Sequence, residues 1–325
     1  MKNNWSNKEA KKYVSFYKAK GISEDLALRV YTTRLLGRNN ELVLHGGGNT
    51  SVKTSLKDID GKNYNVLCVK GSGWDMAEIE PEGLPAVKLQ PLLSLKNKKY
   101  LSDEDMVAYQ KRNLINIKSP NPSVETFLHA FLPFKFVDHT HSDAILSIVD
   151  QHNSRKIIEK IYGNDALFIP YIMPGFILAK KAKMYLKKHP KCKLIILDKH
   201  GIFTFGETAK SSYDAMINFV TKAEQFIASN KSQFVKQIKS FRNNDIFTIE
   251  NIAPIIRGIL KNLKSSDYQN NIILNFRTNK NILEYVNGEK LNIYSQKGTV
   301  TPDHVIRTKQ LPMIIRLKDL SNLKS

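Results

Sequence analysis

The sequence predicts an α/β sandwich whose central sheet contains substantial antiparallel pairing, rather than a doubly wound parallel sheet. Apolar segments of strand length alternate with amphipathic segments of helix length along most of the chain. Several strands follow one another across short turns, as at Asp60-Gly61, and such turns join antiparallel neighbours. Of the 325 residues, 42% are hydrophobic and 25% are charged, which is enough apolar material for a sizeable core.

The helices are predicted from capping residues and from apolar residues at helical spacing. Ser23 begins the first of them and Gly37 stops it, while Ser102 begins another with acidic residues in its first turn. Pro122 suits the first position of a helix over 122–132, because its missing N–H is not needed there. Further helices are expected after Ser142 and over 176–189, about 208–229 and 250–263.

The strands are predicted from short apolar runs bounded by turn residues. They are expected over 41–45, 50–55, 64–70, 134–141, 167–172, 193–198 and 201–206. The polar stretch over about 229–245 predicts a boundary there. We therefore expect a first domain over residues 1–240 and a small C-terminal extension over 241–325.

Charge and composition limit the class of protein. The net charge of +20 comes from 50 Lys and Arg against 30 Asp and Glu, yet Arg supplies only 10 of the cations and Lys is spread along the chain. This favours an anionic small substrate over nucleic acid, which Arg usually reads. The sequence has no apolar run long enough for a membrane span, and its first residues lack the apolar block of a signal peptide, so we expect none there. With two cysteines and no disulfide framework, a cytoplasmic location is expected.

Three histidines stand at the ends of predicted strands. His139 and His141 are two residues apart, so on a strand they point to the same face. His200 closes another apolar strand and is followed by Gly201. Three imidazoles with an open fourth position form the ligand set of a catalytic zinc site, although a His-x-His pair on a strand is more often structural.

Glu125 lies on the predicted helix that precedes the histidine pair. His129 follows it by four residues, which is the spacing of neighbours on one helix face. A carboxylate near a metal can be a ligand, a general base or both in turn. Taken alone, a solvated helix glutamate is the commoner outcome.

Three turns carry Gly, Ser or Asn residues that suit an anion. They lie at residues 46–49, 70–76 and 121–123. Glycine lets backbone N–H groups point at a phosphate without obstruction, and a helix start adds further donors. None of them is a Walker A loop or a G-x-G-x-x-G fingerprint, and each alone is more often an ordinary tight turn.

Taken together, these segments resemble the class II aldolase and adducin family. They occur in the family's order as GGGNTSVK, KGSGWD, PSVETFLHAFL, DHTHSDA, MPG and LDKHG, between about residues 25 and 230. The resemblance is strongest to the aldolase part of bifunctional rhamnulose-1-phosphate aldolase/alcohol dehydrogenases. It continues beyond the core domain of those proteins, in the segments FRTNKNILEYVNGEK and TPDHVIRTK.

The resemblance implies a fold, a metal centre and an assembly. The fold would be a three-layer α/β/α sandwich around a mixed, largely antiparallel sheet. His139, His141 and His200 would bind zinc, and Glu125 would contact the metal at rest and act as acid and base in turnover. The phosphate site would be lined by Gly48, Asn49, Ser72, Gly73 and Ser123. The chain would form a homotetramer with its active site between subunits.

The implied reaction is cleavage of a ketose 1-phosphate, of the rhamnulose-1-phosphate type, to dihydroxyacetone phosphate and an aldehyde. The same family also contains pentulose-phosphate epimerases, a methylthio-ketopentose phosphate dehydratase and the non-catalytic adducin head. The complete set of one Glu and three His residues argues against a binding module, which has no need of it.

Two features depart from the relatives. The chain stops at residue 325 without a G-x-G-x-x-G loop, so we expect no nicotinamide activity, and a stand-alone aldolase or a fragment. The tyrosine that a partner subunit supplies in simpler aldolases has no motif here, and Tyr171 and Tyr213 are the candidates. His304 and Arg307 could meet a phosphate or a neighbouring active site, although a structural loop is the commoner outcome.

Overall fold

The computed structural model describes residues 1–230, 249–262 and 273–314, and the chain divides into two units. The first unit comprises Met1–Asn230 together with Thr299–Thr308, and the second comprises Lys231–Gly298 and Lys309–Ser325. The first unit contains all of the predicted site residues. The boundary predicted at residue 240 lies outside the described residues.

The first unit is built on a seven-stranded sheet in the order β3-β2-β1-β4-β7-β6-β5. Its strands are β1 (Asn49–Lys57), β2 (Asn63–Val69), β3 (Ala86–Lys88), β4 (Phe136–Thr140), β5 (Ala166–Ile169), β6 (Leu194–Leu197) and β7 (Gly201–Gly206). Only β5 and β6 pair in parallel, and every other neighbouring pair is antiparallel. The predicted mixed, largely antiparallel sheet is therefore confirmed.

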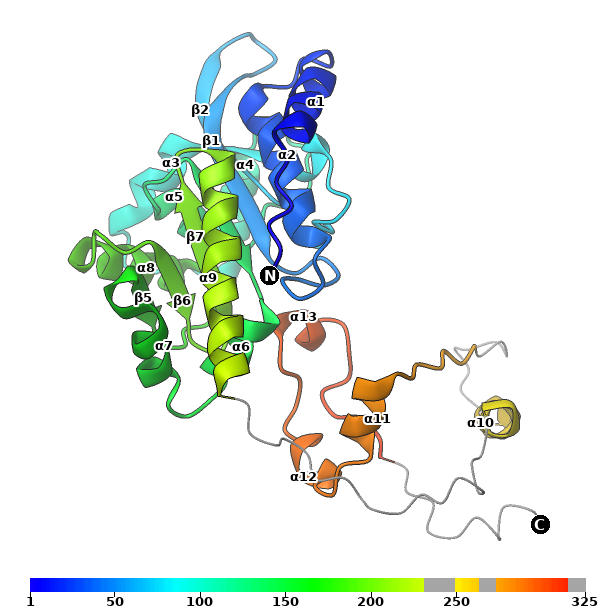
Figure 1. Ribbon diagram of the computed structural model, residues 1–325. Coiled ribbons are helices and arrows are strands. Elements are labelled where there is room, and N and C mark those ends of the chain that lie inside the picture. The colour runs from blue at the N-terminus through cyan, green and yellow to red at the C-terminus, as the bar shows by residue number, and fades with distance from the viewer. Residues whose placement is uncertain (231–248, 263–272, 315–325) are drawn as a thin grey trace. The chain divides into compact units, whose positions relative to one another are not determined.

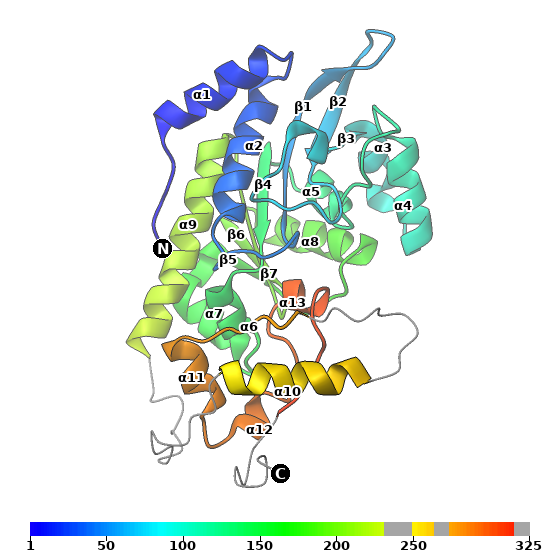
Figure 2. The ribbon, with the colours of Figure 1, turned by 90° about the vertical axis from the view of Figure 1, so that its right-hand side faces the viewer.

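Helices cover both faces of this sheet (Figures 1 and 2). One layer contains α1 (Asn7–Lys18), α2 (Glu24–Gly37), α6 (Asp143–Val149), α7 (Ser154–Tyr162) and α9 (Ala209–Ser229). The other contains α3 (Leu89–Ser94), α4 (Asp103–Arg112), α5 (Thr126–Phe131) and α8 (Phe176–Lys188). Short 3-10 turns occur at Pro81–Gly83, Leu95–Asn97 and Gly163–Asp165.

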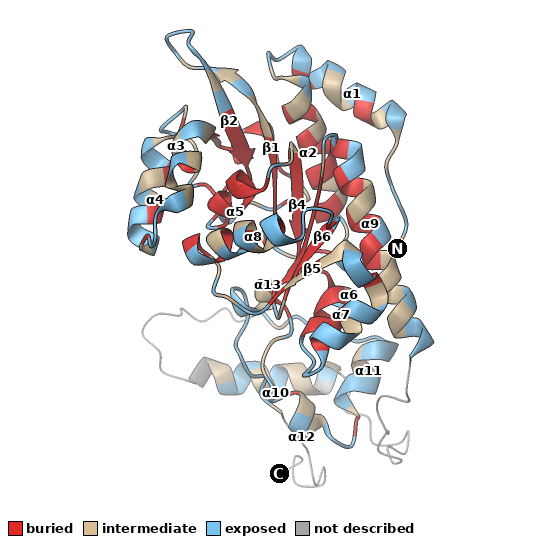
Figure 3. Ribbon diagram, turned by 90° about the vertical axis from the view of Figure 1, so that its left-hand side faces the viewer, coloured by how far each residue is buried: buried red, intermediate tan, exposed pale blue. Residues whose placement is uncertain are grey.

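The alternation of side chains along the strands supplies a core on each side of the sheet. In β6, Ile195 and Leu197 pack with the α5 and α8 residues, whereas Leu194 and Ile196 pack with those of α6 and α9. Figure 3 shows the central strands in the colour of buried residues and exposed residues on the outer helix surfaces. The three-layer α/β/α arrangement follows from this burial on both faces.

Two predicted elements are wrong. Residues 41–45 form turns instead of a strand, because the N–H groups of Leu42 and Val43 donate to the carbonyl of Asn39. The helix expected over 122–132 begins only at Thr126, because Pro122 pairs with Gly71 in a β-bridge and cannot also be helical. The caps predicted at Ser23 and Ser102 are confirmed, since each side chain accepts a hydrogen bond from the first turn of its helix.

The rest of the described chain is helical and irregular. The second unit contains α10 (Ile249–Asn262), α11 (Lys280–Val286) and α12 (Leu291–Tyr294), and α13 (Pro302–Val305) belongs to the first unit. Within the described residues, no helix combines the length and the hydropathy needed to cross a bilayer.

Candidate metal centre

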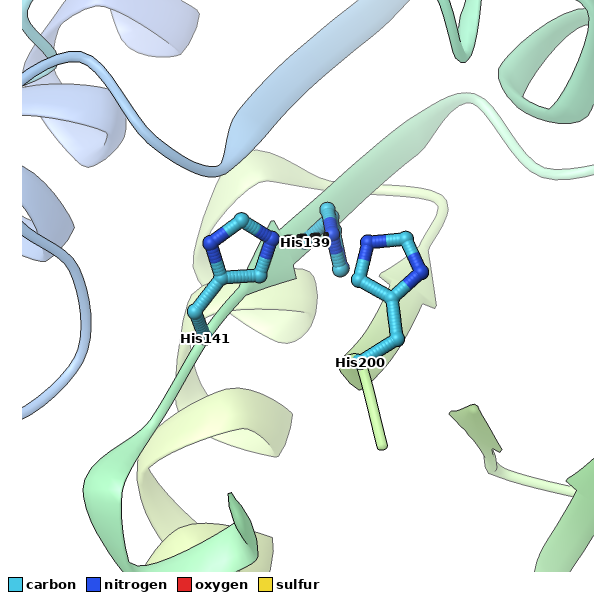
Figure 4. Close-up of side chains that lie close together, drawn as sticks. All are labelled: His139, His141 and His200. Carbon is cyan, nitrogen blue, oxygen red and sulfur yellow. Dashed lines mark hydrogen bonds between the residues drawn. The ribbon is translucent and has the colours of Figure 1, made fainter. Parts of the chain in front are cut away.

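The three predicted histidine ligands converge at one end of the sheet. His139 is in β4, His141 follows its last residue, and His200 lies in the turn between β6 and β7. Figure 4 shows the three rings facing one another, and their candidate ligand atoms all lie within 4.8 Å. Each residue is at most 8% exposed. The pairing of β4 with β7 and of β7 with β6 brings these distant positions together.

The turn that carries His200 requires a close approach of backbone to the histidine pair. Gly201 has a φ of 158°, and a Cβ added to it would lie 2.4 Å from the carbonyl oxygen of Thr140. The same atom would lie 3.1 Å from the ring of His139. Gly201 therefore lets β7 begin directly beside the two other imidazoles.

Hydrogen bonds fix the tautomers of two of these rings. His139 donates from Nδ1 to the carbonyl oxygen of Ile202 over 3.0 Å, and His141 donates from Nδ1 to Oδ1 of Asp303 over 2.5 Å. Burial lowers the pKa of His139 well below its ordinary value, although Glu125 opposes this shift. Both rings therefore direct their Nε2 atoms toward the centre.

The two Nε2 atoms of His139 and His141 lie only 3.0 Å apart. Two ring nitrogens at this distance share either a proton, as in a hydrogen bond, or a cation. Two nitrogens bound at ~2.0–2.1 Å to one tetrahedral zinc ion are separated by about 3.3 Å. The pair therefore fits a shared divalent metal ion.

Glu125, the residue that precedes α5, completes the centre. Its Oε2 lies 3.4 Å from Nε2 of His139, and its Oε1 lies 3.7 Å from Nε2 of His200. The carboxylate is 4% exposed, and its Oε1 has no hydrogen-bond partner among the described residues. A buried oxygen without a partner is costly, so this atom also fits a cation at the centre.

A chain of hydrogen bonds holds Glu125 in place. Asn49 donates from Nδ2 to Oε2 of Glu125 over 2.7 Å, and its Oδ1 accepts from Nε2 of His129. Ser51 Oγ lies 2.7 Å from Nδ1 of His129, which accepts its proton in this tautomer. Burial, more than the nearby cations, lowers the pKa of His129 to about 3, so this ring is neutral.

Glu125 is ionised in this setting. Burial opposes ionisation, but two adjacent imidazoles and the amide of Asn49 outweigh it and lower the pKa of Glu125 to about 2. The centre thus combines three imidazoles with one carboxylate. This is the donor set of a catalytic divalent metal site.

The three turns proposed for an anion lie beside one another. Ser72 donates its N–H to the carbonyl of Asn121, and the N–H of Ser123 donates to the carbonyl of Lys70. Lys70 in turn donates from Nζ to the carbonyl oxygen of Gly46 over 2.8 Å. Hydrogen bonds therefore join the turns at residues 46–49, 70–76 and 121–123 into one predicted phosphate surface, and Asn49 pairs with His139 between β1 and β4.

The predicted phosphate residues occupy two kinds of position on this surface. Ser72 and Gly73 are exposed, whereas Asn49 and Ser123 are buried and bonded to each other over 3.1 Å. Their phosphate role stays a prediction. The Asn49 side chain holds Glu125, a function that the loop pattern did not reveal.

The sequence reasoning missed Asp303. This residue follows Pro302 in α13 and is 3% exposed, with Oδ1 on His141. The nearby His304 and Arg307 stand out in the sequence because their side chains can carry positive charge, whereas a single aspartate in a turn forms no recognisable pattern. His304 bonds to Thr301 at the start of α13, and Arg307 donates from Nε to the carbonyl of His45.

The two candidate tyrosines occupy different environments. Tyr171 is 51% exposed, whereas Tyr213 is buried in α9 and its hydroxyl accepts from the N–H of Asn4. Neither is given a role by its contacts within the described chain.

Family comparisons match most of the chain. Residues 27–227 match the Class II Aldolase and Adducin N-terminal domain, and residues 247–325 match the second domain of class II aldolases. All three histidines and Glu125 lie in the first match, and Asp303 lies in the second.

Two individual proteins are similar over long stretches. The "Uncharacterized oxidoreductase YuxG" of Bacillus subtilis is 37% identical over 303 residues, which is 91% of this chain but only 42% of that protein. The chain thus spans about two fifths of the length of this curated relative. The N-terminal class II aldolase domain of a conserved Thermoplasma acidophilum protein is 43% identical, with a TM-score of 0.62 over 70% of this chain and 99% of that domain.

Proposed function

The chain belongs to the class II aldolase and adducin family, and on that premise we propose that it is a zinc-dependent aldolase. Its substrate would be a ketose 1-phosphate of the rhamnulose-1-phosphate type. The products would be dihydroxyacetone phosphate and an aldehyde. The observation that supports this proposal most strongly is the pair of facing Nε2 atoms, 3.0 Å apart, beside the unpartnered carboxylate oxygen of Glu125.

The chemistry demands stabilisation of a carbanion next to a carbonyl group. Cleavage breaks one carbon–carbon bond, and its electron pair stays on the carbon adjacent to the carbonyl. A divalent ion bound by the three histidines would supply Lewis-acid stabilisation of the negative charge on the carbonyl oxygen. Neutral imidazole ligands suit this purpose because they leave the positive charge of the ion undiminished.

Glu125 is the side chain that we assign to proton transfer at the substrate carbon. It is ionised, buried and aimed at the centre, and Asn49 holds one of its oxygens over 2.7 Å. In cleavage the ionised Glu125 accepts the proton of the substrate hydroxyl that becomes the aldehyde carbonyl, and the protonated carboxyl group then delivers a proton to the carbon. In the reverse direction Glu125 removes a proton from that carbon. General acid–base catalysis of this kind contributes ~10²–10⁴-fold.

The adjoining turns would bind the phosphate group. Arg307 supports this assignment, because its guanidinium lies 3.2 Å from where a Cβ on Gly46 would be, and the carbonyl of Gly73 lies 3.0 Å from the same point. The cation thus lies where two of the turns meet. A phosphate held there would anchor the remote end of the substrate, and this binding energy would support the reacting end.

A turnover screen of ketose 1-phosphates tests the proposal, with dihydroxyacetone phosphate as the coupled readout and with and without a chelator. We expect product from at least one ketose and its loss on chelation. Epimerisation or dehydration without cleavage would replace the aldolase assignment by another activity of the family. A stable protein that binds no metal and turns over none of these compounds would favour a non-catalytic module.

The variant Glu125→Gln separates the proton-transfer role from metal binding. We expect it to retain stoichiometric zinc and lose most turnover. Glu159→Gln is the matched control, because Glu159 is exposed on α7 and pairs with Arg155 at the surface. Near-normal cleavage by Glu125→Gln would exclude this residue as the acid and base.

We also propose a homotetramer in the cytoplasm, in which a neighbouring subunit contributes to the active site. Light scattering during size-exclusion chromatography tests the assembly, and a monomeric but fully active chain would refute the shared site.

A further inference from the structure

We propose that Asp303 is a positioning residue of the metal centre, which orients the imidazole of His141 toward the ion. This inference rests on the metal site of the proposed function, but not on its substrate or reaction. It gives the segment Thr299–Thr308, which belongs to the first unit, a direct part in the centre. That segment follows the histidine by more than 150 residues, since His141 and Asp303 are 162 positions apart.

The segment is itself held in a defined conformation. Thr301 Oγ1 accepts a hydrogen bond from the N–H of His304 and so caps α13. Pro302 occupies the first turn of this short helix, where its missing N–H costs nothing. Asp303 is therefore presented from an ordered turn, and it is 3% exposed.

Both carboxylate oxygens of Asp303 are used. Oδ1 accepts from Nδ1 of His141 over 2.5 Å, and Oδ2 accepts from the N–H of Leu44 over 2.7 Å. The second bond joins the carboxylate to the turn that leads into the glycine-rich loop. Asp303 thus connects a metal ligand to the predicted phosphate surface through one buried side chain.

Gly47 shows that the chain leaves room for this carboxylate. A Cβ added to Gly47 would lie only 1.5 Å from Oδ1 of Asp303 and 2.3 Å from its Cγ. The φ of Gly47 is outside the left-handed region, so backbone conformation does not demand glycine at this position. The approach of Asp303 is what excludes a side chain there.

The chemistry of the contact favours a metal-directed role. An imidazole whose Nδ1–H donates to a carboxylate is held in one tautomer and orientation, and its other nitrogen becomes a stronger ligand. Among the three rings, His139 donates to a backbone carbonyl and Nδ1 of His200 has no partner among the described residues. His141 is thus the ligand whose orientation depends on a distant carboxylate.

Metal affinity of the full-length chain tests this inference without any substrate. Metal-free protein would be titrated with Zn²⁺ against a chelating indicator and with Co²⁺ by visible absorption. We expect Asp303→Asn and Asp303→Ala to weaken metal binding by about 10–100-fold and to change the Co²⁺ spectrum, because the ring of His141 is released. Asp165→Asn is the matched control, since Asp165 pairs with Lys193 away from the centre.

A second variant approaches the same contact from the opposite side. Gly47→Ala should displace the carboxylate and weaken metal binding much as Asp303→Ala does. In the Asp303→Ala background, Gly47→Ala should cost little more, because the atoms that it would meet are gone. Thermal unfolding of the metal-free variants identifies any that fail to fold, and the double variant then carries the test.

The outcomes separate this inference from the proposed function. Loss of metal from His139→Ala with unchanged affinity in Asp303→Ala would overturn the positioning role and leave the metal centre intact. Additive losses from Gly47→Ala and Asp303→Ala would also overturn it. Absence of metal binding by the unmodified chain would refute the proposed metal site itself.

Discussion

The side-chain amide of Asn49 lies against the carboxylate of Glu125, with 2.7 Å between Nδ2 and Oε2. Asn49 begins β1, whereas Glu125 precedes α5, so the contact joins two elements that are 76 residues apart. His129 fixes the other end of this amide, because its Nε2 donates a hydrogen bond to Oδ1 of Asn49. The amide therefore holds Glu125 in a single orientation toward the histidines.

Replacing Asn49 by Ala should lower kcat by about 10-fold or more while zinc content stays unchanged. The physical reason is that a hydrogen bond to a charged group contributes ~1.5–3 kcal/mol and here orients the acid and base. Steady-state kinetics and metal analysis would measure the two effects. Asn65→Ala, at an exposed position of β2, is the control and should behave as the unmodified chain. An unchanged kcat in Asn49→Ala would show that Glu125 needs no such support.

Removing the metal should lower the melting temperature. A metal ion that binds the folded chain and not the unfolded one stabilises the fold, and a ligand at 100-fold excess over its Kd stabilises by ~2.7 kcal/mol. Thermal unfolding with and without EDTA, together with elemental analysis, would measure this. His139→Ala should lose the response to EDTA. Identical melting curves for the unmodified chain in both conditions would contradict a structural contribution of the metal.

Replacing Arg29 by Met should destabilise the fold by about 3–5 kcal/mol, because it leaves the buried carboxylate of Asp138 without its cation. The two side chains are 0% exposed and joined over 2.5 Å between α2 and β4. Urea unfolding monitored by circular dichroism would measure the change. Lys12→Met, which breaks an exposed pair with Glu9, should have little effect. A small loss in Arg29→Met would mean that water reaches Asp138.

Stability should fall as pH is lowered from about 6.5 to 3, in part because of His129. Its folded pKa of about 3 lies below the unfolded value of 6.5, so in this range the unfolded chain binds a proton that the folded chain does not. The groups facing this ring include Glu125, which favours its charge, and Lys53 and Arg29, which oppose it.

The variant His129→Gln isolates this contribution. The dependence of the free energy of unfolding on pH should become shallower by up to ~1.4 kcal/mol per pH unit, which corresponds to one proton. Denaturant titrations at a series of pH values would measure the slope. His152→Gln, at an exposed position, should leave it unchanged. A slope in His129→Gln equal to that of the unmodified chain would mean that this ring titrates normally in the folded state.

Local sequence signals predicted much of the fold. Ser23 and Ser102 correctly predicted where two helices begin, because an N-cap needs only a hydroxyl group and the N–H groups of the next turn. Residues 41–45 misled the strand prediction, since Leu42 and Val43 are buried in the core but belong to a turn. Burial makes a segment apolar whatever its backbone conformation, so the pattern alone could not distinguish the two.

The amino-acid sequence by itself determined the sheet-and-helix architecture and identified three histidines and Glu125 as candidates for one centre. Strand alternation is a property of residues close together in the chain, whereas the histidines and Glu125 were joined into one centre by motifs whose order resembles that of a known family. Only the tertiary structure decided that Asn49 holds Glu125 and that Asp303 holds His141. The residues of these two contacts are 76 and 162 positions apart in the chain. A single amide or carboxylate has no local sequence pattern from which its distant partner can be predicted.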